Sequence, residues 1–318
     1  EYSANTNYII NKDNTYIKWT NKLLNRVKTN QEIVYNPNKL VLTLYRPFTK
    51  KWMYYDRDLV ERTRDYSTSW GKDNIELFTT GRGISRNFSL LVTDNIPNAE
   101  LMYAGQGFLL KNNDLNLMAD PLNINQSFAQ KIGLSQKDTF NYIYGLLNSS
   151  EFQLKYQNDL RKNIARIPIV RNVEKYVEIG EKLINLHLNY EKIPMYQKVK
   201  FTYHGLPNYK VKKIIFGKSR DEKGKLKKDK SILIFNNSIT IENVPKKAYQ
   251  YMVNGKSAIE WIMDQYQVKT DKKSGITDDP NDYSDDPKYI FNLLLRIINV
   301  SVQTVDLINQ LPKLEIEE

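Results

Sequence analysis

The chain of 318 residues has no cysteine and only two histidines, His187 and His204. The absence of cysteine excludes disulfides, thiolate catalysis and cysteine-ligated zinc or iron–sulfur sites, and it suits a reducing compartment. Two histidines cannot form a multi-histidine metal centre, and a Ser-His-Asp triad would have to use one of them. The flanking residues predict a helix-packed imidazole at His187 and a turn at His204.

Long apolar runs are also missing from the sequence. No run approaches the length needed to span a bilayer, and the first residues do not form a signal peptide. We therefore expect a soluble protein without a membrane partner. The chain begins at Glu1 rather than at an initiating Met, which suggests a piece of a longer polypeptide.

The formal net charge of +11 favours a polyanionic partner. Lysine is scattered among many Asn, Ile and Tyr residues, a mixture that AT-rich codon usage alone could produce. The total charge is therefore weak evidence for a polyanionic partner. Arginine is clustered instead, and its planar fork suits phosphates and guanine edges. Half of the twelve arginines lie between Tyr45 and Arg86, namely Arg46, Arg57, Arg62, Arg64, Arg82 and Arg86.

The apolar periodicity predicts a mixed α+β fold in one region that covers residues 1–318. The region has four expected parts: a strand-and-loop recognition part at 1–134, a helical spacer at 135–195, a basic β-meander at 196–245 and a C-terminal helical part at 246–318. Helices are expected at 139–147, from about Ser150, at 173–188, 245–254, 257–266 and 287–311, with a break in the last near Ser301.

The basic meander has three expected antiparallel strands, at 211–216, 231–235 and 238–241. From Glu191 to Lys230 the chain has thirteen Lys or Arg residues against four acidic ones. The functional interpretation is contact with phosphates, and the alternative is a solvated hairpin edge that resists aggregation.

Two segments combine cations with features of a recognition surface. Residues 45–57 gather arginine, lysine and aromatic side chains around Pro47, while Gly81 and Gly83 flank Arg82 in a loop where the backbone could approach a phosphate. Arginines there could reach guanine O6 and N7 in duplex DNA. The predicted DNA contacts are Arg46, Lys50, Lys51, Arg57, Arg82, Arg86, Lys212, Lys213, Lys218 and Arg220. The alternative is that Phe48, Trp52 and Tyr54 are core residues and that the arginines pair with Asp56, Glu61 and Asp65.

Motifs for nucleotide or methyl-transfer chemistry are absent. Asn254-Gly-Lys-Ser257 resembles part of a phosphate loop, but the glycine required five residues before Gly255 is replaced by Gln250. Ser257 and Glu260 instead predict a capping box for the helix that follows. No Pro-Pro pair exists that could form an amino-methyltransferase base-holding loop. We predict no catalytic residue, cofactor site or metal site.

An acidic cluster supports an alternative function. It consists of Asp278, Asp279, Asp282, Asp285 and Asp286. Asp286-Pro-Lys288 is similar to a nuclease Asp-x-Lys signature, so a metal-dependent nuclease is one alternative. The cluster lacks calcium-loop spacing and a preceding strand, which favours a capped loop. A structural docking module without its own DNA specificity is the other alternative.

Several motifs together resemble the C-terminal specificity region of type ISP restriction-modification enzymes. They occur in order along nearly the whole chain, and the block from Asn254 to Trp261 is highly specific. The others include Tyr45-Arg-Pro-Phe48, Trp52-Met-Tyr-Tyr-Asp56, Phe88-Ser-Leu-Leu-Val-Thr-Asp94, Tyr142-Ile-Tyr-Gly145, Tyr156-Gln-Asn-Asp-Leu160 and Tyr266-Gln-Val-Lys-Thr-Asp271.

The resemblance implies a non-catalytic target-recognition domain that selects a double-stranded DNA sequence in the bacterial cytoplasm. Its partners would be the helicase-nuclease and adenine-N6 methyltransferase modules of the same polypeptide. The ATP, magnesium and S-adenosylmethionine sites would belong to those modules and not to this segment. Departures from the family pattern at 79–87 and 106–125 mark the expected sequence-reading loops.

Overall fold

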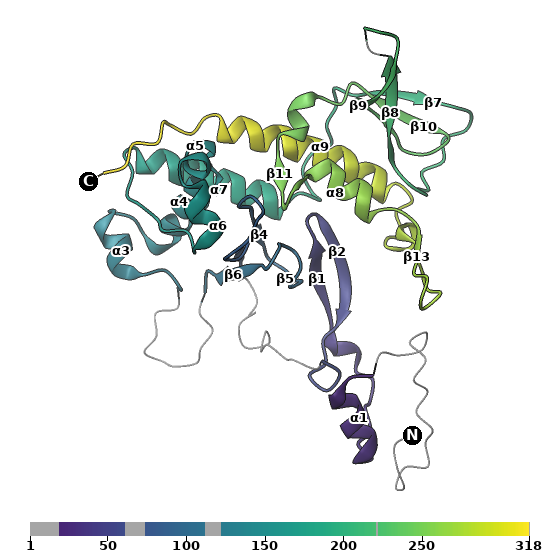
Figure 1. Ribbon diagram of the computed structural model, residues 1–318, viewed down its shortest axis with the longest axis horizontal. Coiled ribbons are helices and arrows are strands. Elements are labelled where there is room, and N and C mark those ends of the chain that lie inside the picture. The colour runs from purple at the N-terminus through teal and green to yellow at the C-terminus, as the bar shows by residue number, and fades with distance from the viewer. Residues whose placement is uncertain (1–18, 61–73, 112–121, 221, 318) are drawn as a thin grey trace.

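The computed structural model describes residues 19–60, 74–111, 122–220 and 222–317. In these ranges helices and small sheets form a body from which two hairpins project, one formed by β1 and β2 and the other by β8 and β9 (Figure 1). The fold is mixed α+β, as the periodicity predicted.

The first half of the described chain contains short strands followed by helices. Its elements are α1 (Asn21–Lys28), η1 (Pro37–Lys39), β1 (Leu40–Arg46), β2 (Thr49–Tyr54), β3 (Glu76–Thr79), β4 (Leu90–Thr93), β5 (Ile96–Pro97), β6 (Gln106–Leu109), α3 (Gln126–Lys131), α4 (Gln136–Asn148) and α5 (Ser150–Lys155).

The second half alternates helices with a four-stranded sheet and two short ribbons. Its elements are α6 (Gln157–Lys162), α7 (Val173–Leu188), β7 (Lys200–Tyr203), β8 (Ile215–Arg220), β9 (Leu226–Ile234), β10 (Ile239–Glu242), η2 (Lys246–Tyr249), β11 (Met252–Val253), β12 (Lys256–Ser257), α8 (Ala258–Gln265), β13 (Lys269–Thr270), β14 (Thr277–Asp278), η3 (Pro280–Asp282) and α9 (Tyr289–Ile308).

Two small sheets lie in the strand-and-loop part. One has the order β2-β1-β5, and the other has the order β4-β3-β6 with antiparallel pairing throughout. Both pairings of β3 are in register from Glu76 to Thr79. The connection between β3 and β4 therefore leaves and re-enters the sheet at adjacent positions, which fixes the base of its loop.

The α4 and α7 helices pack at very short range. A Cβ on Gly180 would lie 1.9 Å from the backbone oxygen of Asn141, and one on Gly145 would lie 2.3 Å from that of Tyr176. Only glycine permits this approach. Ser135 accepts a hydrogen bond from the Asp138 amide and caps α4.

Two apolar clusters form the core. One joins the β4-β3-β6 sheet to α4 and α7, and the other joins the β1–β2 hairpin and the four-stranded sheet to α8 and α9. His187 lies buried in the interior, with Nδ1 2.7 Å from the Tyr144 hydroxyl and Nε2 2.9 Å from Thr304 Oγ1. Burial lowers the pKa of this imidazole to about 3, so it is neutral and structural, as predicted.

The four-stranded sheet has the order β7-β10-β9-β8, so the predicted meander gains a strand that the periodicity missed. The first predicted strand starts too early, because residues 211–214 pack against the segment around Asn281. The Val211 amide donates to Asn281 Oδ1 at 2.8 Å, and Asn281 Nδ2 donates back to the Val211 carbonyl at 2.8 Å.

Two helix predictions need correction. Residues 245–254 form only the short η2 turn followed by β11, and the chain then reverses through Asn254 and Gly255, both at positive φ. The last helix, α9, has no break at Ser301, whose hydroxyl donates to the Ile297 carbonyl at 2.7 Å within the helix.

The prediction that no apolar run is long enough to span a bilayer is also wrong when helices are judged by length and composition only. Tyr289–Ile308 passes that test, but 61% of its most apolar window is buried inside the protein. Its apolar residues face the second core cluster, as expected for the central helix of a folded domain.

Candidate nucleic-acid interface

The β3–β4 connection, residues 80–89, is named here the arginine loop. Its base is closed by the Thr80 amide, which donates to the Ser89 carbonyl at 2.9 Å, and by the Ser89 amide, which donates to Thr80 Oγ1 at 3.2 Å. The Gly81 amide donates to the Tyr103 carbonyl at 3.1 Å. A Cβ at Gly81 would lie 1.9 Å from the Ala104 oxygen, so this crossing requires glycine.

The far side of the arginine loop is fixed to α6. The Ile84 side chain is buried, its amide donates to the Arg161 carbonyl at 3.1 Å, and the Arg161 guanidinium donates to Asn87. These contacts hold the loop at both ends and in the middle. The side chains between the anchors are therefore presented from a fixed backbone.

Arg82 and Arg86 are both exposed on the arginine loop. The Arg86 guanidinium carbon lies 4.6 Å from the centre of the Tyr103 ring, which orients it by a cation–π contact. Arg82 makes no hydrogen bond or ion pair within the described part of the chain. Both guanidinium forks are thus available to an external ligand.

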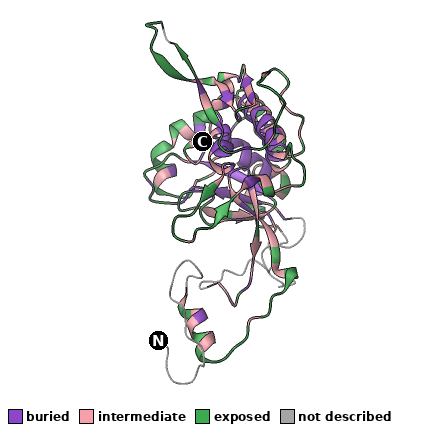
Figure 2. Cartoon of the chain, turned by 90° about the vertical axis from the view of Figure 1, so that its right-hand side faces the viewer, coloured by how far each residue is buried: buried purple, intermediate pink, exposed green. Residues whose placement is uncertain are grey.

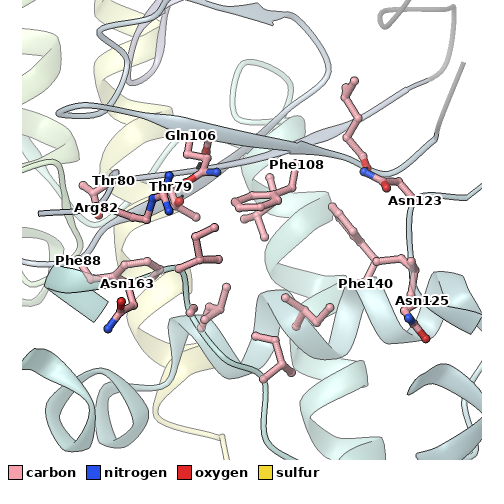
Figure 3. A pocket seen from close by; sticks show the side chains of 18 of the residues that line it. Thr79, Thr80, Arg82, Phe88, Gln106, Phe108, Asn123, Asn125, Phe140 and Asn163 are labelled. Atoms are coloured by element: carbon pink, nitrogen blue, oxygen red, sulfur yellow. Dashed lines mark hydrogen bonds between the residues drawn. The ribbon is translucent and has the colours of Figure 1, made fainter. Parts of the chain in front are cut away.

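A cavity of about 410 Å³ lies beside the arginine loop (Figure 3). It is bounded by β3, β6, α3, α4 and the segment after α6. Figure 3 shows Arg82, Thr79 and Gln106 together at one end, with Phe88 and Asn163 nearby and Phe108 toward the middle. The residues that line it are Leu77, Thr79, Thr80, Arg82, Phe88, Gln106, Phe108, Leu109, Asn123, Ile124, Asn125, Phe128, Phe140, Ile143, Leu147, Asn163, Ile164, Ala165 and Ile167.

Three predicted contacts on the β1–β2 hairpin are occupied by ion pairs within the chain. Each pair joins the hairpin to a distant segment: Arg46 to Glu100 at 2.7 Å, Lys50 to Glu191 at 2.8 Å and Lys51 to Asp278 at 2.6 Å. Burial alone would lower the pKa of Lys51, but its hydrogen bonds to Asp278 and Tyr283 raise it above the usual value. These cations hold the hairpin in place.

The alternative interpretation of this hairpin is correct only in part. Phe48 is fully buried, yet Trp52 is 70% exposed, and Asp56 pairs with Lys39 at 2.8 Å rather than with an arginine. Arg57 is exposed. Arg62, Arg64, Glu61 and Asp65 lie outside the described residues.

The β8–β9 pair is named here the basic hairpin, and it extends from the body with most of its side chains exposed (Figure 2). Lys218 and Arg220 are exposed on β8, and Lys212 and Lys213 are exposed just before it. Figures 1 and 2 place the basic hairpin at the opposite end of the body from the β1–β2 hairpin. The predicted cations therefore do not form one continuous patch.

Three of the five acidic residues of the predicted cluster act as structural acceptors. Asp278 pairs with Lys51 and accepts from the Tyr283 hydroxyl at 2.6 Å, while Asp279 accepts from the Asn281 amide at 2.9 Å. Asp286 accepts from the Lys288 amide at 2.9 Å. Among the residues described, no three metal-ligating side chains come together. The capped-loop interpretation fits these contacts.

The model of the Type ISP C-terminal specificity domain matches residues 1–293. The chain belongs to this family. This specificity domain has the same fold as parts of larger proteins whose structures are solved. No curated protein matches it significantly.

Two solved structures resemble the specificity domain closely. One is a nuclease-deletion mutant of the Type ISP restriction-modification enzyme LlaGI in complex with a DNA substrate mimic, with 39% identity over 97% of this chain and a TM-score of 0.82. The other is the ATP-dependent Type ISP enzyme LlaBIII bound to DNA, with 40% identity over 95% of this chain and a TM-score of 0.82. The chain spans only 24% and 20% of those two proteins.

A third structure, the DrdV–DNA complex, shares the fold. Its TM-score is 0.79 at 24% identity, and the match covers 93% of this chain and 31% of that one.

The sequence did not point to the cavity or to the contacts of Asn254. The Asn254 amide donates to Ser89 Oγ at 2.8 Å, its Nδ2 donates to the Leu101 carbonyl at 3.3 Å, and its Oδ1 accepts from the Tyr103 amide at 3.2 Å. These partners lie more than 150 residues away in the chain. The only signal in the sequence was that Asn254 begins the highly specific block from Asn254 to Trp261.

Proposed function

We propose that this specificity domain recognises a double-stranded DNA sequence for a Type ISP restriction-modification enzyme. The observation that carries the proposal is the arginine loop, which holds two exposed guanidinium groups on a backbone fixed from three directions. The solved structures of LlaGI, in complex with a DNA substrate mimic, and of LlaBIII, bound to DNA, support the proposal.

Base reading requires rigidly held donors because phosphate contacts alone carry no sequence information. A guanidinium that is fixed in direction can donate two hydrogen bonds to guanine O6 and N7, which contributes about 1–3 kcal/mol of discrimination. Arg86, held against the Tyr103 ring, meets this requirement. Arg82 has no partner in the described chain and is available for a contact with DNA. Arg46, Lys50 and Lys51 position the hairpin instead.

The basic hairpin has the properties of a sequence-independent contact. Lys218 and Arg220 are exposed side chains on a two-stranded ribbon that extends into solvent. Such cations attract phosphates without fixing a register on the bases. In the proposal, the hairpin contacts the DNA backbone at a place separate from the arginine loop.

The specificity domain itself carries no catalytic step in this proposal. DNA cleavage, translocation and adenine methylation would be performed by other modules of the same polypeptide, which would also bind magnesium, ATP and S-adenosylmethionine. The acidic cluster supports this division, since Asp279 and Asp286 cap turns and Asp278 pairs with Lys51. The expected location is the bacterial cytoplasm.

Selection from a randomised duplex library tests the proposal. We expect the domain to enrich a preferred sequence, and the Arg82→Ala/Arg86→Ala variant to bind that sequence about 5- to 150-fold more weakly for each arginine–guanine pair that the substitutions remove. Lys131→Ala, an exposed cation on α3, is the matched control and should bind like the unmodified domain. Equal binding by the double variant would contradict base reading by the arginine loop.

A further inference from the structure

We propose that the cavity beside the arginine loop binds a nucleobase and that Arg82, which lines it, binds the attached phosphate, while Arg86, outside the lining, remains the arginine that reads a guanine edge. This inference rests on the proposed DNA-recognition function and names the ligand of one site within it. The inference needs more than the exposed arginines, since the cavity is formed by side chains from five separate chain segments.

The size and lining of the cavity match a planar aromatic ligand. Its volume of about 410 Å³ lies in the range of roughly 300–1,000 Å³ that is usual for small-molecule sites. Four phenylalanine rings contribute to the wall, and a base inserted between apolar and aromatic side chains gains stacking energy. They are Phe88, Phe108, Phe128 and Phe140.

Polar groups converge at one end of the cavity. Arg82, Thr79 and Gln106 lie together there, and Asn163 is nearby (Figure 3). The side-chain amides of Gln106 and Asn163 make no hydrogen bond in the described part of the chain. An amide offers both a donor and an acceptor, which is what the edge of a base requires.

The charge of the lining selects among ligand classes. Among the described residues, no Asp or Glu lines the cavity, and Arg82 is its single charged group. An anionic ligand is therefore favoured over a cation or a metal ion. A wholly apolar ligand would leave the Arg82 guanidinium and the two free amides without partners, which costs binding energy. A nucleotide satisfies both the aromatic wall and the polar end.

The nucleotide could come from two sources, a base extruded from a duplex or a free nucleotide. Binding of the four deoxynucleoside 5′-monophosphates and of deoxyribose 5-phosphate is measured by calorimetry or saturation-transfer NMR. In parallel, a duplex with one unpaired nucleotide competes with the fully paired duplex. We expect nucleotides to bind more tightly than deoxyribose 5-phosphate, because the base fills the cavity.

Two variants localise the ligand. Ala165→Trp places a large side chain in the cavity wall and should weaken nucleotide binding at least tenfold. Arg82→Gln removes an exposed charge without disturbing the core, so it tests the site even if Ala165→Trp does not fold. It should weaken binding of nucleotides but not of the corresponding nucleosides. Leu206→Trp, at a position 92% exposed, is the control for adding tryptophan.

If the domain prefers the duplex with an unpaired nucleotide and Ala165→Trp loses this preference, the cavity binds an extruded base. Nucleotide binding without that preference would assign it to a free nucleotide. The inference is overturned if no nucleotide binds saturably and no duplex preference exists, or if both variants leave binding unchanged. The preference for the selected duplex over a scrambled one, measured alongside with fully paired DNA, shows whether the proposed function stands when the cavity inference fails.

Discussion

The environment of each arginine decides which of them can read a base. The Arg46 side chain is 18% exposed and is held by Glu100 and Asn98, so a DNA contact would first require these hydrogen bonds to break. Arg82 and Arg86 carry no such cost, because neither forms an ion pair in the described chain. Arginine content alone cannot separate these cases, since the difference lies in long-range partners.

A buried carboxyl at the start of β3 makes a prediction about pH. Glu76 is 6% exposed, its Oε2 has no hydrogen-bond partner among the described residues, and burial raises the pKa of its carboxyl to about 7. The stabilising contribution of the protonated group is fully present below the unfolded pKa near 4.5 and is lost as pH rises through 7.

Replacing Glu76 by Gln should therefore remove this pH dependence. The shift corresponds to about 3 kcal/mol, so we expect Glu76→Gln to exceed the unmodified domain in unfolding free energy by up to that amount at pH 8. Urea unfolding between pH 5 and 8 measures it. Glu181→Gln, at an exposed position, is the matched control. If the unfolding free energies of Glu76→Gln and of the unmodified domain depend on pH in the same way, the Glu76 carboxyl does not have the raised pKa described above.

At the scale of elements, the β11–β12 turn supports the arginine loop from the far end of the sequence. Asn254 hydrogen-bonds to Ser89, at the end of the arginine loop, and to Tyr103, on which Arg86 rests. Its backbone has φ of 47°, a left-handed conformation that asparagine tolerates well. The turn thus links the C-terminal helical part to the recognition side chains.

Asn254→Gly keeps the left-handed backbone and removes only the side-chain hydrogen bonds. We expect the variant to lose preference for the selected sequence while binding of scrambled duplex changes little, because Arg86 would lose its fixed direction. Binding titrations on both duplexes measure the effect. Asn243→Gly, at another exposed asparagine with φ of 61°, is the control. An unchanged preference in Asn254→Gly would argue against positioning through this turn.

The basic hairpin makes a different prediction, since it is expected to bind phosphates. Lys218→Gln and Arg220→Gln should weaken binding to every sequence alike. Removing one cation–phosphate interaction should reduce the slope of log affinity against log salt by about 0.9. Fluorescence anisotropy across a salt series provides the slope. A change in the selected sequence, rather than in the slope, would place the hairpin in a base-reading role.

At the scale of the whole molecule, local patterns were predictable and long-range partners were not. The sequence located α4, α7 and the Ser257–Glu260 capping box, because caps and apolar periodicity are local signals. It missed β7, whose pairing with β10 depends on a distant strand, and it extended a helix through Asn254, where hydrogen bonds to Ser89 and Leu101 fix a turn. The predicted boundaries between the four parts remain a prediction.

The candidate site follows the same rule. The glycines around Arg82 predicted a loop, and Arg82 and Arg86 are exposed on it. The ion pairs of Arg46, Lys50 and Lys51 were not predictable in this way, because they join segments 54 to 227 residues apart. No periodicity reports such ion pairs. The cavity was equally hidden, since its walls come from strands, helices and a loop that meet only in the folded chain.

The most direct test of the central claim is the affinity ratio between the selected duplex and a scrambled one for the Arg82→Lys/Arg86→Lys variant. Lysine keeps both charges and removes the bidentate fork. We predict that the ratio falls by about 5- to 150-fold for each arginine–guanine pair while affinity for the scrambled duplex stays the same. An unchanged ratio would show that charge alone is needed at these positions and would contradict sequence reading by the arginine loop.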